Sequence, residues 1–176
     1  MSKRILVTYA TRGGSTAGVA ESIGKVLTEG GNQVDVLPVQ EVKDLTKYHA
    51  VVAGSAIRGA KWLPEALQFI RTHQADLKQK PFAAFMVCIT LAMPDSEKYA
   101  QGLKDWMQPV RSLVRPVSEG YFAGSLDFST LPLTPKILLM RLAVALRIFP
   151  LGDHRDWNKI RAWAEGIHPL LEKQVH

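Results

Sequence analysis

A run of glycines and hydroxyl-bearing residues near the start of the chain has the composition of an anion-binding loop. The run, Thr11-Arg12-Gly13-Gly14-Ser15-Thr16, follows directly on the apolar stretch Ile5-Leu6-Val7. Small residues let a phosphate approach the backbone, a following helix N-terminus favours negative charge, and hydroxyl groups add donors. The spacings of a nucleotide P-loop and of a dinucleotide-binding turn are both missing. The sequence therefore predicts another type of anion cradle, with an ordinary strand-to-helix turn as the alternative.

The residues around this loop alternate between strand and helix patterns. Short apolar runs indicate buried strands, and apolar residues at intervals of three and four indicate helices. Pro109 is expected to kink or split the helix in which it lies. The predicted strands are Ile5–Tyr9, Gln33–Val39, Ala50–Ala53, Phe82–Ile89 and Val117–Ala123. The predicted helices are Thr16–Glu29, one beginning at Pro64, one opened by Asp95 or Ser96, and a last one that contains Trp157 and Leu171 and is capped by Asp153 or Asp156.

Five strands alternating with helices predict an α/β protein with a parallel sheet covered by helices on both faces. The length of 176 residues, with 47% hydrophobic residues, favours a single domain over residues 1–176. Ligands of such sheets bind beyond the carboxyl ends of the strands. The segments expected at that edge are 9–16, 54–62, 89–99 and the chain from 124 onward.

Composition excludes several kinds of chemistry. The one cysteine, Cys88, lies in an apolar run and is predicted to be a small buried hydrophobe, and the five histidines lack metal-ligand spacing, so no metal is expected. The net charge of +6 favours an anionic small molecule or an anionic membrane surface as partner. No basic and aromatic cluster points to nucleic acid. The lack of a signal-peptide pattern predicts a cytoplasmic location.

A long connection, residues 125–152, exceeds what a minimal five-stranded sheet needs. It contains the run 136–149, which is rich in Leu, Ala, Met and Arg, lies between two prolines, and is predicted to be helical. The run is too short and too charged to span a bilayer. Four alternatives remain open: a membrane surface, an apolar substrate cleft, a dimer interface, or packing on the sheet edge.

Two motifs together resemble the flavodoxin-like family. Thr11-x-x-Gly14-x-Thr16 is similar to the family's FMN-phosphate loop, and the run 54–58, Gly-Ser-Ala-Ile-Arg, is similar to the loop that flanks its flavin ring. The resemblance covers nearly the whole chain in element order. It implies a doubly wound five-stranded parallel sheet of order 2-1-3-4-5 with FMN bound at its edge. Residues 10–12, Ile57-Arg58 and the late insertion resemble the menaquinone-dependent protoporphyrinogen IX dehydrogenase branch, the oxygen-independent protoporphyrinogen oxidases.

The resemblance implies FMN contacts from three segments and no catalytic side chain, because the flavin carries the chemistry. Ala10 and Gly13 replace hydroxyl residues of relatives, which shifts phosphate binding toward backbone N–H groups. Arg58 is expected either to tune the ring or bind a substrate carboxylate, or to be a solvated loop charge. Trp62 either stacks on the ring or anchors the core. The expected contacts are Thr11, Arg12, Gly13, Gly14, Ser15 and Thr16 on the phosphate, Ser55, Ala56, Ile57, Arg58 and Gly59 on one side of the ring, and Ile89, Thr90, Leu91 and Ala92 on the other.

The same resemblance implies an FMN-dependent oxidoreductase. Its expected substrate is protoporphyrinogen IX or a similar apolar anion, with a quinone as electron acceptor. The expected partners also include a membrane surface, contacted peripherally through residues 133–150, and a second copy of the chain. The alternative function is a flavodoxin-type electron carrier between protein partners, and a third is a flavin-free interaction domain.

Overall fold

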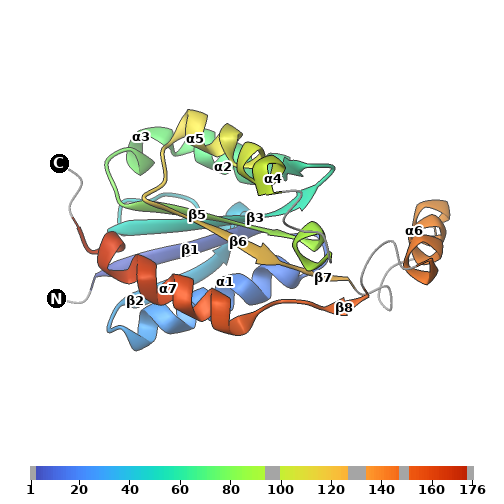
Figure 1. Cartoon of the computed structure of the whole chain (residues 1–176). Helices are drawn as coiled ribbons and strands as arrows, with labels where there is room; N and C mark the ends of the chain where they lie inside the picture. The colour runs from blue at the N-terminus through green and yellow to red at the C-terminus, as the bar shows by residue number, and fades with distance from the viewer. Residues whose placement is uncertain (1–2, 94–99, 127–133, 147–150, 174–176) are drawn as a thin grey trace.

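The computed structural model describes residues 3–93, 100–126, 134–146 and 151–173. Five parallel strands cross the middle of the molecule in the order β2-β1-β3-β5-β6 (Figure 1). This confirms the predicted doubly wound order, because β5 and β6 are the fourth and fifth long strands. A short strand, β4, pairs antiparallel with β3. The bounds are β1 Arg4–Ala10, β2 Gln33–Pro38, β3 Ala50–Arg58, β4 Lys61–Trp62, β5 Phe82–Cys88 and β6 Ser118–Ala123.

Helices cover both faces of the sheet (Figure 1). The helices α1 and α7 lie on one face, and α2, α3, α4 and α5 lie on the other. Successive residues of β1 and β5 point into two different apolar layers, so every residue of β5 is buried. The bounds are α1 Ser15–Glu29, α2 Pro64–Thr72, α3 Gln74–Leu77, α4 Ala100–Trp106, α5 Gln108–Leu113 and α7 Trp157–Leu171, with the 3₁₀ turns η1 Val39–Glu41 and η2 Ile89–Ala92.

The third strand is longer than its sequence pattern indicates. The prediction that this strand ends at Ala53 was wrong, because β3 continues through Gly54 to Arg58. A Cβ atom on Gly54 would collide with the ring of Phe85 on β5, so this glycine permits close packing between β3 and β5. The chain then turns and returns as β4, which places the predicted second loop in a β-hairpin.

Two predicted helix boundaries are confirmed. The helix that contains Pro109 is split, since α4 ends at Trp106 and α5 has Pro109 in its first turn. Asp156 caps α7 by accepting a hydrogen bond from the Lys159 N–H at 3.0 Å. The predicted caps at 95 and 96 lie outside the described residues.

The insertion begins with a two-stranded stem, in which β7 (Ser125–Leu126) pairs antiparallel with β8 (Gly152–Asp153). It carries α6 (Pro135–Ala145), whose first turn is capped by the Thr134 hydroxyl. The predicted helix is confirmed up to residue 145, and residues 147–150 lie outside the described part. Figure 1 shows α6 standing apart from the sheet and its covering helices. Among the described helices, none has both the length and the apolar character that crossing a bilayer requires.

Candidate functional site

The carboxyl edge of the sheet brings together the three predicted groups of cofactor contacts. Tyr9 and Ala10 at the end of β1 pair with Gly54 and Ser55 of β3, so the loop after β1 lies beside the β3–β4 hairpin. The neighbouring strand β5 pairs with β3 as far as Ala56 and continues directly into η2. The segments 11–16, 55–59 and 89–92 therefore share one edge, as the topology predicts.

The loop after β1 has an open glycine backbone. Gly14 has a φ of +84° and donates its N–H to the Thr11 hydroxyl at 3.0 Å. A Cβ atom on Gly13 or Gly14 would meet nothing within 4 Å, so the space over this backbone is free for a ligand. The Gly14 carbonyl accepts the Gly18 N–H at 3.3 Å, which continues the loop into α1. The loop thus presents backbone N–H groups at a helix N-terminus.

Thr16 provides the clearest sign that this loop is built for a ligand. Its side chain is fully buried, and its hydroxyl has no hydrogen-bond partner among the described residues. Leaving a buried hydroxyl unpaired costs about 1–3 kcal/mol. A phosphate oxygen at the loop would accept this hydrogen bond, so the residues present fit the phosphate of FMN.

The side chain of Arg12 is paired with a carboxylate, although the sequence predicts it to contact the phosphate. Both of its terminal nitrogens contact the carboxylate of Glu65 in the first turn of α2, with Nη2 3.0 Å from Oε2. This hydrogen bond lowers the pKa of Glu65. The guanidinium therefore ties the loop to α2, and the backbone N–H is the part of Arg12 that remains for a phosphate.

Arg155 is a residue of this site that the sequence analysis did not identify. Its Nη1 donates to the Ser15 carbonyl at 3.4 Å, and its guanidinium lies over the Trp157 ring, 4.6 Å from the centroid. Asp153 in β8 holds it through bonds of 2.8 and 2.6 Å, which lower the pKa of Asp153 to about 2. Gly18 makes this contact possible, since a Cβ there would collide with Arg155. A cation thus lies against the first turn of α1.

The β3–β4 hairpin is fixed by Ser55. The Ser55 hydroxyl is buried, donates to the Ala56 carbonyl at 2.8 Å and accepts the Leu63 N–H at 3.0 Å. Ser55 therefore ties the hairpin together. This structural role could not be predicted from the motif in which Ser55 lies. Gly59 and Ala60 form a two-residue turn with φ values of +55° and +60°. Because Ala60 is not a glycine, its positive φ stores strain of about 1–3 kcal/mol beside the site.

Of the remaining hairpin residues, Ala56 and Ile57 are half-buried and Arg58 is exposed at the turn. Trp62 is 3% exposed and packs in the core between the sheet and α2. Burial therefore favours the prediction that Trp62 anchors the core over the prediction that it stacks on a flavin ring. Its indole Nε1 has no hydrogen-bond partner among the described residues.

The segment after β5 forms the remaining wall of the site. The four residues of η2 are all half-buried, so this segment is partly accessible at the edge. Cys88 directly before them is 4% exposed, and burial raises the pKa of its thiol. This confirms Cys88 as a buried small residue rather than a thiolate nucleophile. Its carbonyl accepts the Gly124 N–H at 3.1 Å, which joins the end of β6 to this wall.

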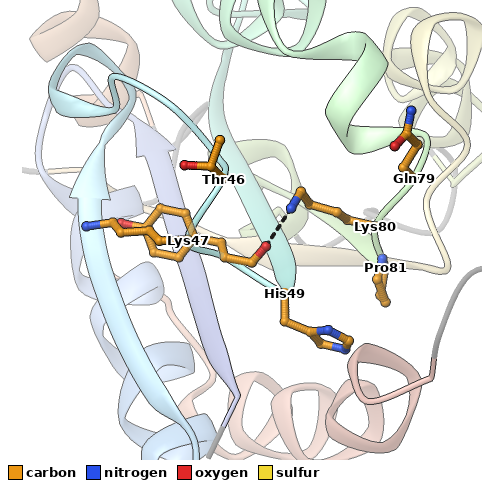
Figure 2. Close-up of a pocket in the computed structure, with 7 residues that line it drawn as sticks. Thr46, Lys47, His49, Gln79, Lys80 and Pro81 are labelled. Carbon is orange, nitrogen blue, oxygen red and sulfur yellow. Dashed lines mark hydrogen bonds between the residues drawn. The ribbon is translucent and has the colours of Figure 1, made fainter.

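A cavity of about 520 Å³ lies at the opposite, amino edge of the sheet (Figure 2). Its cations are engaged by the protein, because Lys80 donates to the Tyr48 carbonyl at 2.7 Å and Lys47 lies 3.3 Å from the Asp35 carboxylate. The described residues contain no cluster of His, Cys, Asp and Glu that could hold a metal. The open glycine backbone at a helix N-terminus, which fits an anion, lies at the other edge, so we place the functional site there. The cavity is lined by Thr46, Lys47, Tyr48, His49, Gln79, Lys80 and Pro81.

Known structures share the fold of this chain. The chain superimposes on a short-chain flavodoxin associated with a bacterial microcompartment, with a TM-score of 0.60 and 15% identity over 98% of this chain and 100% of that one. It also superimposes on a flavodoxin from the domain Archaea, with a TM-score of 0.55 and 16% identity over 97% and 99% of the two chains. A flavodoxin from Streptococcus pneumonia gives 0.58 and 15% over 92% and 95%.

These structural likenesses establish the fold, and a match to a family profile establishes the family. A search of curated proteins finds no significant match. The profile of the Flavodoxin domain family matches residues 6–145, which is most of the chain and includes all three segments of the site. The chain therefore belongs to the flavodoxin domain family, whose members typically bind FMN and act in electron transfer.

Proposed function

We propose that this protein is a flavodoxin-type electron carrier with FMN bound at the carboxyl edge of the sheet. The observation that carries the proposal is the buried, unpartnered hydroxyl of Thr16 beside an open glycine backbone. Backbone N–H groups of segment 11–16 would hold the phosphate together with the hydroxyls of Thr11 and Thr16. The family membership and the flavodoxin folds of the superimposed structures support the same reading.

The protein's own residues orient the flavin and set its electrostatic surroundings. The half-buried residues Ala56 and Ile57 would face one side of the ring and the backbone of η2 the other, while bound flavin supplies one- and two-electron transfer. Arg58, exposed at the hairpin turn, would place a positive charge near the ring edge and favour its reduced, anionic state. No acid–base side chain is needed for this function.

The visible absorption spectrum of the purified protein, followed by FMN titration of the stripped protein, tests the cofactor. We expect flavin bands and tight FMN binding. Thr16→Val should weaken FMN binding roughly tenfold, because it removes one hydrogen bond to a charged group. Thr28→Val, on the exposed part of the same helix, is the matched control. Colourless protein that takes up no added FMN would reject the proposal in favour of a flavin-free domain.

A second candidate is an FMN-dependent dehydrogenase that passes electrons from an apolar anionic substrate to a quinone. The observation that favours it is the insertion, whose helix α6 exposes leucines beyond the cofactor edge. Protoporphyrinogen IX has the matching chemistry, with apolar rings and two carboxylates. This reading requires the insertion to take part in turnover.

Two experiments separate the candidates. Redox titration of the holoprotein should show two resolved one-electron steps for a carrier and a single two-electron step for the dehydrogenase. Anaerobic mixing with protoporphyrinogen and a menaquinone analogue should form porphyrin above background only for the dehydrogenase. In that case, replacing residues 133–150 by a flexible linker should abolish turnover while FMN stays bound.

A further inference from the structure

The helix α6 presents an apolar surface that the rest of the described protein leaves uncovered. Leu138, Leu139, Leu142 and Leu146 are all 55–67% exposed. Figure 1 shows α6 apart from both helical layers, and no extensive packing joins it to another described element. Contiguous exposed apolar surface of this kind marks an interaction site.

The leucines fall on one side of the helix. At about 100° per residue, Leu138, Leu142, Leu146 and Leu139 span an arc of about 100°, which we call the leucine arc. The less exposed residues Ile137 and Val144 lie on the opposite side of the helix. The arc therefore faces outward from the protein as one continuous apolar strip.

Cationic positions border the leucine arc. By the same spacing, Arg141 lies about 60° beyond one border and position 136, a lysine in the sequence, about 60° beyond the other. An apolar strip with Lys and Arg at its borders is the arrangement of helices that lie in a lipid interface, because the cations reach the headgroups while the apolar side chains enter the acyl boundary. At 11 residues the helix is about 16 Å long, which matches lying on a bilayer rather than crossing it.

Charge favours a lipid surface over a second copy of the chain. The net charge of +6 attracts the protein to anionic headgroups and makes two copies repel each other. The stem of the insertion follows β6 at the carboxyl edge, where the His154 N–H donates to the Gly124 carbonyl at 3.2 Å. A surface that binds α6 therefore lies on the side of the protein where the carboxyl edge and the cofactor loops are.

We propose that the leucine arc docks the protein on an anionic membrane surface, with the carboxyl edge of the sheet turned toward the lipid. This inference goes beyond the redox function, and it is tested independently of FMN chemistry. Docking in this orientation brings the cofactor edge close to electron donors or acceptors dissolved in the bilayer.

Vesicle flotation of the full-length holoprotein tests the proposal. We expect binding to mixed phosphatidylglycerol–phosphatidylcholine vesicles that weakens with added salt and is much weaker on phosphatidylcholine alone. Leu138→Gln/Leu142→Gln should lower the partition coefficient by roughly 10- to 100-fold through lost apolar burial. Val117→Gln is the matched control, because Val117 is an exposed apolar residue just before β6, at the amino edge.

The charge component has its own comparison. Arg141→Gln should lower binding to the mixed vesicles about fivefold, since one cation near an anionic surface contributes about 1 kcal/mol. The exposed Lys78→Gln removes the same charge at the opposite, amino edge, just before β5, and should change binding less than twofold. Thermal unfolding and the flavin spectrum verify that each variant is folded.

Two results would overturn the proposal. One is a folded holoprotein that fails to float with anionic vesicles at low salt. The other is a dimer in sedimentation experiments without lipid that Leu138→Gln/Leu142→Gln converts to monomer, which would assign the leucine arc to a second copy of the chain.

Discussion

Arg155 donates a hydrogen bond across 140 residues of sequence to the carbonyl of Ser15, with 3.4 Å between Nη1 and the oxygen. Asp153 at the base of the insertion holds the same guanidinium. The base of the insertion is thus connected by one side chain to the first turn of α1. This connection places a cation beside the loop that we assign to the phosphate of FMN.

Arg155→Gln should weaken FMN binding about fivefold to tenfold, because it removes a positive charge near the phosphate and releases the first turn of α1. Titration of the stripped protein with FMN and with riboflavin measures the effect. Riboflavin lacks the phosphate, so its affinity should change less than twofold. Arg161→Gln in α7, which removes an arginine paired with Glu29 of α1 and Glu165 of α7, is the control. Equal losses for both flavins would assign Arg155 a purely structural role.

Gly54→Ala should destabilise the fold by about 1–3 kcal/mol through overpacking, because the new methyl group would collide with the Phe85 ring. Urea unfolding measures the free energy of unfolding. Gly166→Ala inside α7 is the matched control, since a Cβ there meets nothing within 4 Å. Removing a helix-interior glycine should raise stability by about 0.5–1 kcal/mol. A neutral Gly54→Ala would contradict the close packing of β3 on β5.

The same glycine shows where sequence reasoning stops. Uniformly apolar residues predicted β5 correctly, because a strand covered on both faces needs no polar side. Locally, Gly54 predicts a strand end. The structure instead requires a glycine there because the Phe85 ring lies against it, and Phe85 is 31 positions further along the chain, beyond the reach of local patterns. The contact of Arg155 with Ser15 cannot be predicted from local patterns either, because the two residues are distant in sequence. Composition predicted α6, but only the structure shows that its leucines are exposed.

Acid should destabilise the protein through Asp35. The Tyr48 hydroxyl bonds this carboxylate at 2.7 Å, and Arg4 and Lys47 add to it, so its pKa is lowered to about 2. The unfolded chain takes up the proton at a higher pH than the folded chain, so this stabilisation is complete above the unfolded pKa and is lost as the pH falls from about 5 to about 2. Over this pH range the free energy of unfolding should fall by about 1–2 kcal/mol because of Asp35.

Urea unfolding between these pH values measures the effect in the parent and in Asp35→Asn. The parent should lose more unfolding free energy on acidification than the variant does. Asp76→Asn, at an exposed position of α3, is the control and should follow the parent. An Asp35→Asn protein with the same pH dependence as the parent would show that this cluster does not govern acid stability.

The final prediction separates two roles for Arg12. Arg12→Gln alone should weaken FMN binding about threefold to tenfold, because it leaves the Glu65 carboxylate unpaired near the phosphate loop. In Arg12→Gln/Glu65→Gln that unpaired charge is gone, so the affinity should return to within twofold of the parent. The double-mutant cycle, measured by FMN titration, isolates the pairwise contribution. If the double variant stays as weak as Arg12→Gln, the guanidinium itself contributes, at the phosphate or by tying the loop to α2. If it recovers, Arg12 acts by neutralising the Glu65 carboxylate with which it is paired.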